Sequence, residues 1–409
     1  MSSYMLAVCV CFGLVAIGEI ISYFTKAVVP SMAGALILYL IFIWIGMPQT
    51  YPETAGFTTI GDMAFLMLCV GLGTNVAPAE YIKNIKSVVM AFVAVVFALV
   101  FTVGIGGIFF GFDTMLAGAG ACCGGGAISG IAALSKLNQL GLVGLLSVPT
   151  ILIVSVDPLG QPISSFILRK YAKRLNAEDA YLLEKKVQHG EMDKHPVRLT
   201  KDGIPYGSEE NPSPFFRAWI PSKLEADGVV LLEMALTVWA GVELEKLTTI
   251  SSFLWVFLLG ILGCTIGLFR MNLFDERSHS AGFLTVLIIG YLFTSMNGIT
   301  PQSVLSVLPA VIALIVLSAI GLALGGYISG KLMGYDPILS AAAGVGIMFL
   351  FPGITIISNE VSARVARNDE EKKFIYGKIA PSMYIMGNAG FLFGLLGTVT
   401  ILLPLLAKF

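Results

Sequence analysis

Charged residues are scarce in this sequence. Asp, Glu, Lys and Arg together make up 12% of its 409 residues, whereas soluble proteins carry about 25%. Apolar residues make up 56%, and the mean hydropathy is +0.86. The net charge of −1 gives no reason to expect nucleic acid as a partner. This composition excludes an ordinary soluble domain and predicts an all-helical protein that crosses a membrane many times.

Metal-binding and catalytic patterns are missing too. The six cysteines lie in apolar runs and the three histidines lie in or beside polar loops, so neither a disulfide framework nor a Cys/His metal site is indicated. The sequence has no HExxH zinc motif, no paired aspartates typical of a membrane protease, and no acidic cluster for Mg²⁺. We therefore expect no enzyme activity and no cofactor.

Apolar runs of about 20 residues, the length that crosses a bilayer, recur along the chain. We expect ten spans at about 4–24, 28–46, 60–77, 87–110, 140–168, 225–244, 251–269, 279–297, 303–328 and 376–405. The first run has no signal-peptide cleavage site and is interpreted as a true span. The remaining soluble-looking segment, 169–223, carries four prolines and mixed charge. We interpret it as a linker between two membrane halves, 1–168 and 224–409, rather than as a regulatory domain.

Two segments rich in small residues lie between these spans. Segment 113–137 contains Gly124–Gly126, and segment 336–360 contains Pro352–Gly353. Aligned at a constant offset of 223, the two share six identities in 25 positions, and the same offset pairs Pro78 with Pro301, Gly107 with Gly330 and Gly111 with Gly334. The sequence therefore predicts an internal repeat with one broken helical segment in each copy.

The distribution of basic residues predicts the orientation of these segments. If both segments turn back within the bilayer and the N-terminus starts outside, all but three of the 25 Lys and Arg residues fall inside. If 113–137 crossed completely, the basic loop 169–223 would lie outside. We expect two inverted repeats of about five spans, with re-entrant hairpins that enter from opposite faces. Both termini would be extracytoplasmic and the loop cytoplasmic.

Breaks in a helix at membrane depth expose peptide groups that lipid cannot satisfy. Free N–H groups at the start of a half-helix suit a carboxylate, and free carbonyls suit Na⁺. Asp113 and Asp336 are predicted to cap the helices that lead into the breaks. The predicted substrate-binding residues surround the breaks: Gly124, Gly125, Gly126, Ser129, Gly130, Gly353, Thr355, Ser358 and Asn359. The alternative for Ser129 and Thr355 is a hydrogen bond to a carbonyl of their own helix.

One carboxylate, Asp157, follows an apolar run and precedes a proline. A carboxylate within the membrane is costly, and its presence favours a functional role. The alternatives are a position near the membrane face or a pairing with backbone. Asn388 has a similar place in the last span, seven residues after Pro381. We predict sodium sites built from Asp157, Asn388, Ser129 and Thr355.

Several pieces of the sequence resemble the bacterial glutamate:sodium symporter family, whose relatives include elevator-type carriers. They are Gly71–Val76 (GLGTNV), Ala132–Leu137 (AALSKL) at the end of the first hairpin, Ala341–Gly346 in the second, and Leu402–Leu406. The resemblance implies inverted repeats with opposed hairpins, and a core that moves against a fixed dimerisation domain. It also implies a homodimer and Na⁺-coupled glutamate uptake through the bacterial inner membrane.

The hairpin tips depart from that family's pattern. The family carries a histidine in each glycine-rich tip, whereas this chain has Ile128 near the first tip and the bulky apolar run 347–351 at the second. The working hypothesis is Na⁺-coupled symport of glutamate or a related carboxylate by an elevator mechanism. Two alternatives stay open on the same fold, a carrier of another organic anion and a Na⁺/H⁺ antiporter that uses Asp157.

Overall fold

The computed structural model describes residues 2–24, 31–74, 78–177, 227–248, 250–269, 273, 280–350 and 353–406. These residues form helices and connecting turns, with no strand among them. Five helices are long and apolar enough to cross a membrane: Tyr4–Phe24, Ile85–Phe110, Ser147–Asn176, Pro301–Met333 and Asp369–Leu406. The described residues therefore confirm the prediction of an all-helical protein with helices apolar enough to cross a membrane.

The first half of the chain supplies the helices up to residue 177. They are α1 (Ser2–Phe24), α2 (Ser31–Ile45), α3 (Tyr51–Thr54), α4 (Phe57–Gly73), α5 (Pro78–Lys83), α6 (Ile85–Leu99), η1 (Val100–Gly106), α7 (Gly107–Phe110), α8 (Phe112–Cys123), α9 (Gly126–Gln139), η2 (Val143–Leu145) and α10 (Ser147–Ala177).

The second half supplies the described helices from residue 227 onward. It contains α12 (Asp227–Thr248), α13 (Ser252–Ile266), α14 (Ser280–Ser295), α15 (Pro301–Met333), α16 (Pro337–Gly346), α17 (Gly353–Val365), α18 (Asp369–Gly394), η4 (Leu395–Leu402) and α19 (Leu403–Leu406). The first residues of α4 and α14, 57 and 280, are 223 apart, and those of α10 and α18, 147 and 369, are 222 apart. These two pairs of helices therefore begin close to the offset of 223 at which the two small-residue segments align.

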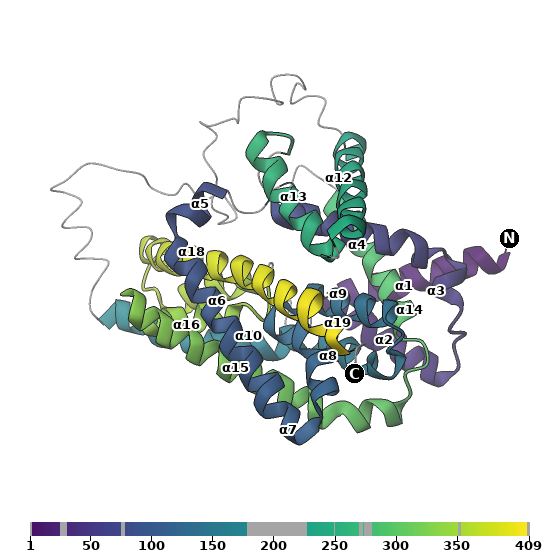
Figure 1. Cartoon of the computed structure of the whole chain (residues 1–409), viewed down its shortest axis with the longest axis horizontal. Coiled ribbons are helices and arrows are strands. Elements are labelled where there is room, and N and C mark those ends of the chain that lie inside the picture. The colour runs from purple at the N-terminus through teal and green to yellow at the C-terminus, as the bar shows by residue number, and fades with distance from the viewer. Residues whose placement is uncertain are drawn as a thin grey trace.

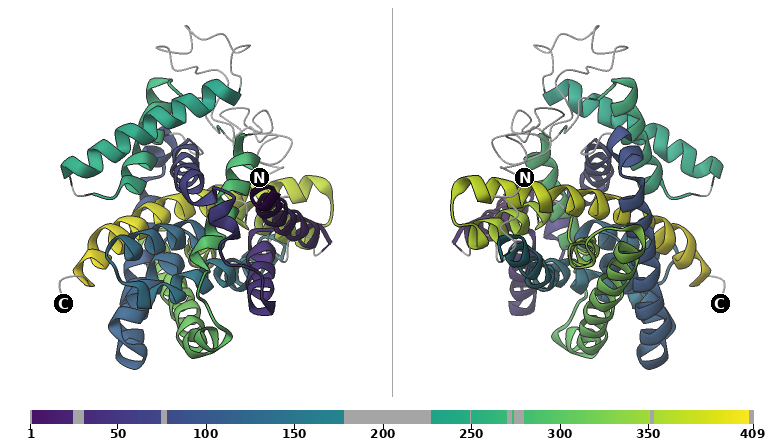
Figure 2. Two further views of the ribbon diagram at one scale, coloured as in Figure 1. Left: turned by 90° about the vertical axis from the view of Figure 1, so that its right-hand side faces the viewer. Right: turned by 90° about the vertical axis from the view of Figure 1, so that its left-hand side faces the viewer.

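The helices pack in two groups, and each half of the chain contributes to both. In the first group, α1 packs on α2, α12 packs on α13, and α4 packs on α12, α13 and α14. In the second group, α6 packs on α15 and α18, while α8, α9, α16 and α17 pack on α10. Figures 1 and 2 show α12 and α13 together at one edge of the molecule, and Figure 1 shows α6 beside α15.

Small residues allow the helices within each group to approach closely. A Cβ placed on Gly321 of α15 would lie 2.6 Å from the Cα of Ala98 on α6. In the first group, a Cβ on Gly260 of α13 would lie 2.3 Å from the carbonyl oxygen of Val70 on α4. Such contacts are typical of membrane helices, whose association depends on packing because lipid is as apolar as the side chains.

Four helices at expected spans are shorter than expected. α2, α4, α13 and α14 contain 15, 17, 15 and 16 residues. A 15-residue helix is about 22 Å long, against about 30 Å for the hydrocarbon core of a bilayer. The helix at the expected span 225–244, α12, is not among the five long apolar helices. It carries charged residues at both ends, among them Asp227 and Lys246.

The predicted start of the linker, at residue 169, lies within a helix. α10 continues to Ala177, so residues 169–177 are helical rather than part of a loop. The end of this helix is held by an ion pair between Arg174 and Asp336, the residue that precedes α16. Residues 178–226, which hold the rest of the expected linker, lie outside the described residues.

Candidate ion and substrate site

The first glycine-rich segment folds into a helical hairpin. α8 and α9 lie antiparallel, and a Cβ on Gly120 would be 3.0 Å from the Cβ of Ala133. Between them, Gly125 and Gly126 have φ angles of +107° and +61°, in the left-handed region that glycine adopts without steric cost. The predicted break at the glycines is therefore present.

The residue that starts α8 differs from the prediction. Gly111, with a φ of +89°, is the N-cap, and Asp113 lies within the first turn. In the first turn, the negative charge of the Asp113 carboxylate still interacts favourably with the positive N-terminal end of the α8 dipole. In the second segment Asp336 is the N-cap as predicted, and its Oδ1 accepts hydrogen bonds from the backbone N–H groups of Ile338 and Leu339 at 2.9 and 3.0 Å.

The second segment runs toward the middle of α10 and then returns. Before α16, Asp336 pairs with Arg174 near the end of α10. Beyond α16, Phe349 packs on Gly160. At the end of α17, the Val365 carbonyl accepts a hydrogen bond of 2.8 Å from Asn176 Nδ2. Both helices of this segment therefore lie along the C-terminal half of α10.

The tips of the two segments meet at Asp157. A Cβ on Gly126 would lie 2.5 Å from Asp157 Oδ1 and 2.5 Å from the carbonyl oxygen of Met348. Oδ1 is buried and has no hydrogen-bond partner among the described residues, although the side chain as a whole is partly exposed. A buried acceptor without a donor is costly, so a cation or a proton at this oxygen would stabilise the arrangement. The pairing with backbone considered for Asp157 is not present.

Prolines release further carbonyl groups near Asp157. Pro158 and Pro162 both lie inside α10. Because proline has no N–H, the carbonyls four residues earlier, those of Val154 and Pro158, have no helical donor. The middle of α10 thus offers free backbone oxygens on either side of the carboxylate.

α18 closes the other side of the two tips. A Cβ on Gly124 would lie 2.7 Å from the Cα of Gly394, and one on Gly125 would touch the side chains of Phe391 and Leu350 at 2.6 and 2.8 Å. The side chains that face the first tip from α18 and from the second tip are apolar. Residues 347–350 of the second tip are at most 6% exposed.

The hydroxyls predicted to coordinate Na⁺ are engaged elsewhere. Ser129 Oγ donates a hydrogen bond to the carbonyl of Gly124, which lies in the break before α9 and not in the helix of Ser129, so this bond differs from the alternative considered for this residue. Thr355 Oγ1 is hydrogen-bonded to the Tyr384 hydroxyl of α18. Both residues lie beside the breaks, yet neither hydroxyl is directed to Asp157 in this arrangement.

Asn388 lies on α18 at the level of the second tip, because its neighbour Gly387 packs on Ile354 and Leu350. Its side chain is hydrogen-bonded to Tyr81 of α5. Burial raises the pKa of Tyr81 above its ordinary value, and the bond to Asn388 lowers it by a smaller amount, so the hydroxyl stays neutral. Asn388 is thus held by α5.

The other predicted residues differ in their surroundings. Gly130 packs on Ile153 of α10. Ser358 Oγ is buried without a hydrogen-bond partner among the described residues, and Asn359 is partly exposed. The structure therefore brings Gly126 to Asp157 and places Gly124 and Gly125 against α18, whereas Ser358 and Asn359 follow on the returning helix.

Gln161 is absent from the residues predicted above. A Cβ on Gly353, the first residue of α17, would lie 2.9 Å from Gln161 Nε2. The side chain therefore places an amide beside the start of α17, one turn along α10 from Asp157. The signal was available in the sequence, because residues four apart share one face of a helix.

Basic residues are missing from the segments that build this region. The sequence has no Lys, Arg or His in 87–135, 137–168, 332–363 or 379–407. Two of the carboxylates in these segments are paired, Asp336 with Arg174 and Glu360 with Arg364. Asp157 lies between the tips without such a partner, so a cation or a proton at this carboxylate would balance its charge.

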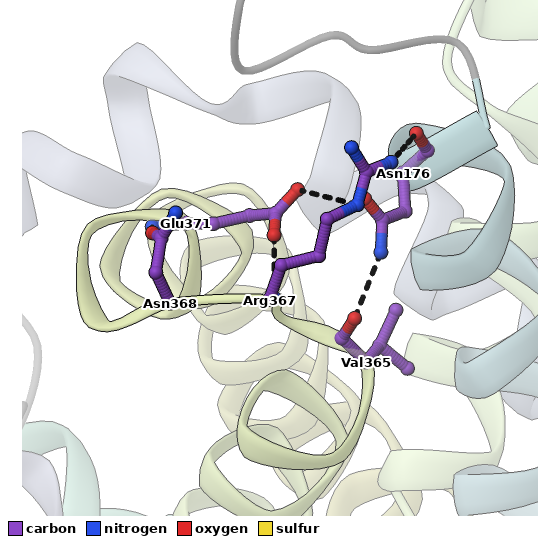
Figure 3. Close-up of polar contacts among 5 residues, drawn as sticks. All are labelled: Asn176, Val365, Arg367, Asn368 and Glu371. Carbon is purple, nitrogen blue, oxygen red and sulfur yellow. Dashed lines mark hydrogen bonds and ion pairs between the residues drawn. The ribbon is translucent and has the colours of Figure 1, made fainter.

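Polar contacts attach the second segment to the C-terminal end of α10 (Figure 3). Arg367 Nη2 donates to the Asn176 carbonyl at 2.8 Å, and the Arg367 backbone N–H donates to Glu371 Oε2 at 2.6 Å. The side chain of Asn368 caps α18 by accepting from the Glu371 N–H at 2.8 Å. The end of α17 and the start of α18 are thereby tied to α10.

The sequence matches no protein-family model and no curated protein sequence. Function is therefore inferred from the arrangement of residues. Among the described residues, no group of three or more His, Cys, Asp or Glu side chains lies together. One carboxylate and the nearby carbonyl of Met348 are oxygen ligands of the kind that suits a hard cation such as Na⁺.

Proposed function

We propose that this chain is a secondary active transporter that couples the uptake of glutamate or a related carboxylate to Na⁺. One observation carries the proposal. The unpartnered Oδ1 of Asp157 and the carbonyl of Met348 converge on Gly126, where two broken helical segments meet in the middle of a long apolar helix. Binding sites of secondary transporters lie at such meeting points of broken helices.

The proposed topology has two inverted repeats with re-entrant hairpins. The starts of α4 and α14, and those of α10 and α18, are separated by nearly the repeat offset. The first hairpin packs along the N-terminal half of α10 through Leu152 and Ile153, and the second along its C-terminal half. Because α10 is long enough to cross a bilayer, this packing supports entry of the hairpins from opposite faces. A homodimer in the inner membrane, with both termini outside and the loop after Ala177 inside, completes the proposal.

The charge balance supports an order of binding. Na⁺ binds first at Asp157 Oδ1 and the Met348 carbonyl, where a buried negative charge has no partner. A carboxylate substrate then binds beside the ion and the start of α17, where free N–H groups suit an anion. At a separation of about 4 Å and an effective dielectric constant of about 20, the ion pair contributes about 4 kcal/mol.

The movement proposed is a shift of the second helix group against the first. Two contacts between the groups are side-chain contacts that can be exchanged. Phe257 of α13 lies against Phe391 of α18 with ring centroids 5.1 Å apart, and Lys136 of α9 lies 3.9 Å from Glu245 of α12. The glycine-mediated backbone packing within each group is tighter, which favours rigid groups and a mobile boundary.

Uptake into proteoliposomes tests the proposal. A labelled carboxylate, either glutamate or a related acid, should accumulate when an inward Na⁺ gradient is imposed, and the accumulation should be lost when a Na⁺ ionophore removes the gradient. Asp157→Asn should lose the Na⁺ dependence, whereas Asp113→Asn, a change of an exposed carboxylate in the same helix group, should keep it. Uptake of carboxylates that is the same with and without the gradient argues against coupling.

A Na⁺/H⁺ antiporter is the second candidate, because the buried and unpartnered Asp157 carboxylate can hold a proton in place of Na⁺. Such an exchanger would release protons from acid-loaded proteoliposomes when Na⁺ is added, with no carboxylate present. A pH-sensitive dye measures this release. Proton release that requires a carboxylate substrate supports symport instead.

A further inference from the structure

We infer that the transported molecule carries a single carboxylate on an apolar body, and that an acid with a second carboxylate, such as glutamate, is disfavoured. The compounds that fit are small monocarboxylic acids and amino acids with apolar side chains. This inference rests on the proposed function and narrows its substrate class. It follows from the charge and the lining of the region between the two tips.

The charge around the tips accommodates one carboxylate. Asp157 is balanced by Na⁺, and the substrate carboxylate is matched by the same ion and by the N-terminal end of α17, where Gln161 adds amide donors beside Gly353. A second carboxylate would find no positive group, because the segments that form the region contain no Lys, Arg or His. Burying a charge without a partner is strongly unfavourable.

The lining between the tips and α18 suits an apolar body. Leu350 touches both the first tip, at Gly125, and α18, at Gly387. Phe391 packs on Gly125 from α18, and Ile347 packs on Gly390. These side chains are at most 6% exposed, so a substrate that enters between them exchanges apolar contacts for apolar contacts. A charged group would lose its hydration there.

Two matched pairs of compounds test the inference on the purified full-length protein in detergent with saturating Na⁺. Leucine is compared with glutamate, and 4-methylpentanoate with succinate, by the shift of the thermal unfolding midpoint and by competition for binding. In each pair the compound with one carboxylate should bind at least about tenfold more tightly, which is about 1.4 kcal/mol. A preference for glutamate or succinate, or equal affinity within a pair, overturns the inference.

Transport separates the failure of this inference from that of the proposed function. Na⁺-driven uptake of glutamate that leucine does not inhibit overturns the inference and leaves the proposed function in place. No binding and no Na⁺-driven uptake of any of the four compounds overturns both. Na⁺-driven uptake of leucine or 4-methylpentanoate that exceeds that of its partner supports both.

A charge introduced at the lining provides a reversal test. Leu350→Arg places a cation beside the tips and should move the preference at least tenfold toward glutamate. Leu332→Arg is the matched control, because Leu332 is 79% exposed near the end of α15, and it should leave the preference unchanged. If Leu350→Arg does not fold, Leu350→Gln supplies a neutral donor and should shift the preference in the same direction. An unchanged preference in a folded Leu350 variant counts against the inference.

Discussion

Arg174 on α10 forms an ion pair with Asp336, the residue whose carboxylate caps α16. The Asp336 carboxylate therefore holds the start of α16 in two ways. It satisfies free N–H groups of α16 and attaches that helix to the end of α10. Asp113, which aligns with Asp336 at an offset of 223, does not cap α8, because Gly111 is the N-cap there.

Removal of this cap should lower stability. Asp336→Ala loses two backbone hydrogen bonds and the ion pair with Arg174, and we expect a loss of about 1–2 kcal/mol. Asp336→Asn keeps the cap and loses the charge, so it should cost less. Asp113→Ala, the matched control, should change the thermal unfolding midpoint least. Equal losses for the variants at 336 and 113 would show that the cap at Asp336 contributes nothing special.

Gly126 should not tolerate a side chain. In Gly126→Ala the methyl group would lie 2.5 Å from both Asp157 Oδ1 and the Met348 carbonyl, and its φ of +61° is unfavourable by about 1–2 kcal/mol. We expect Na⁺-driven uptake to fall at least about tenfold. Gly141→Ala is the control, since Gly141 has a φ of +74° with nothing within 4 Å of the added atom. A transport rate in Gly126→Ala equal to that of Gly141→Ala argues that the tips need not meet closely.

Asp157 should determine the response to Na⁺. In Asp157→Asn the negative charge is lost while the shape is kept, and Na⁺ should no longer raise the thermal unfolding midpoint. In the unchanged protein, Na⁺ at a hundred times its dissociation constant should stabilise by about 2.7 kcal/mol. Titration with NaCl against choline chloride separates this binding from ionic strength. A full Na⁺ response in Asp157→Asn removes this carboxylate from the site.

Movement between the helix groups should stop when the groups are joined. Phe257 and Phe391 lie on opposite sides of the boundary with ring centroids 5.1 Å apart. In a background without the six native cysteines, Phe257→Cys with Phe391→Cys should be cross-linked by Hg²⁺. Uptake should then be lost and restored by reduction, with each single variant as a control. Full uptake by the cross-linked protein is incompatible with an elevator movement at this boundary.

Much of the fold follows from local sequence. Long apolar runs predict α1, α6, α10, α15 and α18 because spanning a bilayer requires length and apolarity within one segment. The break after Cys123 follows from three consecutive glycines, two of which adopt left-handed φ angles. The N-cap at Asp336 was also predictable, with Pro337 directly after it. The N-cap at Gly111 was not, since it depends on how α7 ends.

The contents of the site were less predictable. Asp157 was singled out because a carboxylate within an apolar run is costly. The hydrogen bonds of Ser129 to Gly124 and of Thr355 to Tyr384 depend on side-chain rotation and on packing against α18. The role of Gln161 depends on where α17 begins in space.

The sequence by itself determined that this chain is helical, with long apolar segments typical of a membrane protein, and that one helix breaks at three consecutive glycines. Composition and residue spacing act within single segments, so they specify helices and their breaks. The tertiary structure decided that Gly126 and Met348, 222 positions apart in the chain, meet at the carboxylate of Asp157. That meeting depends on the packing of both hairpins against α10 and α18, and no local pattern records it.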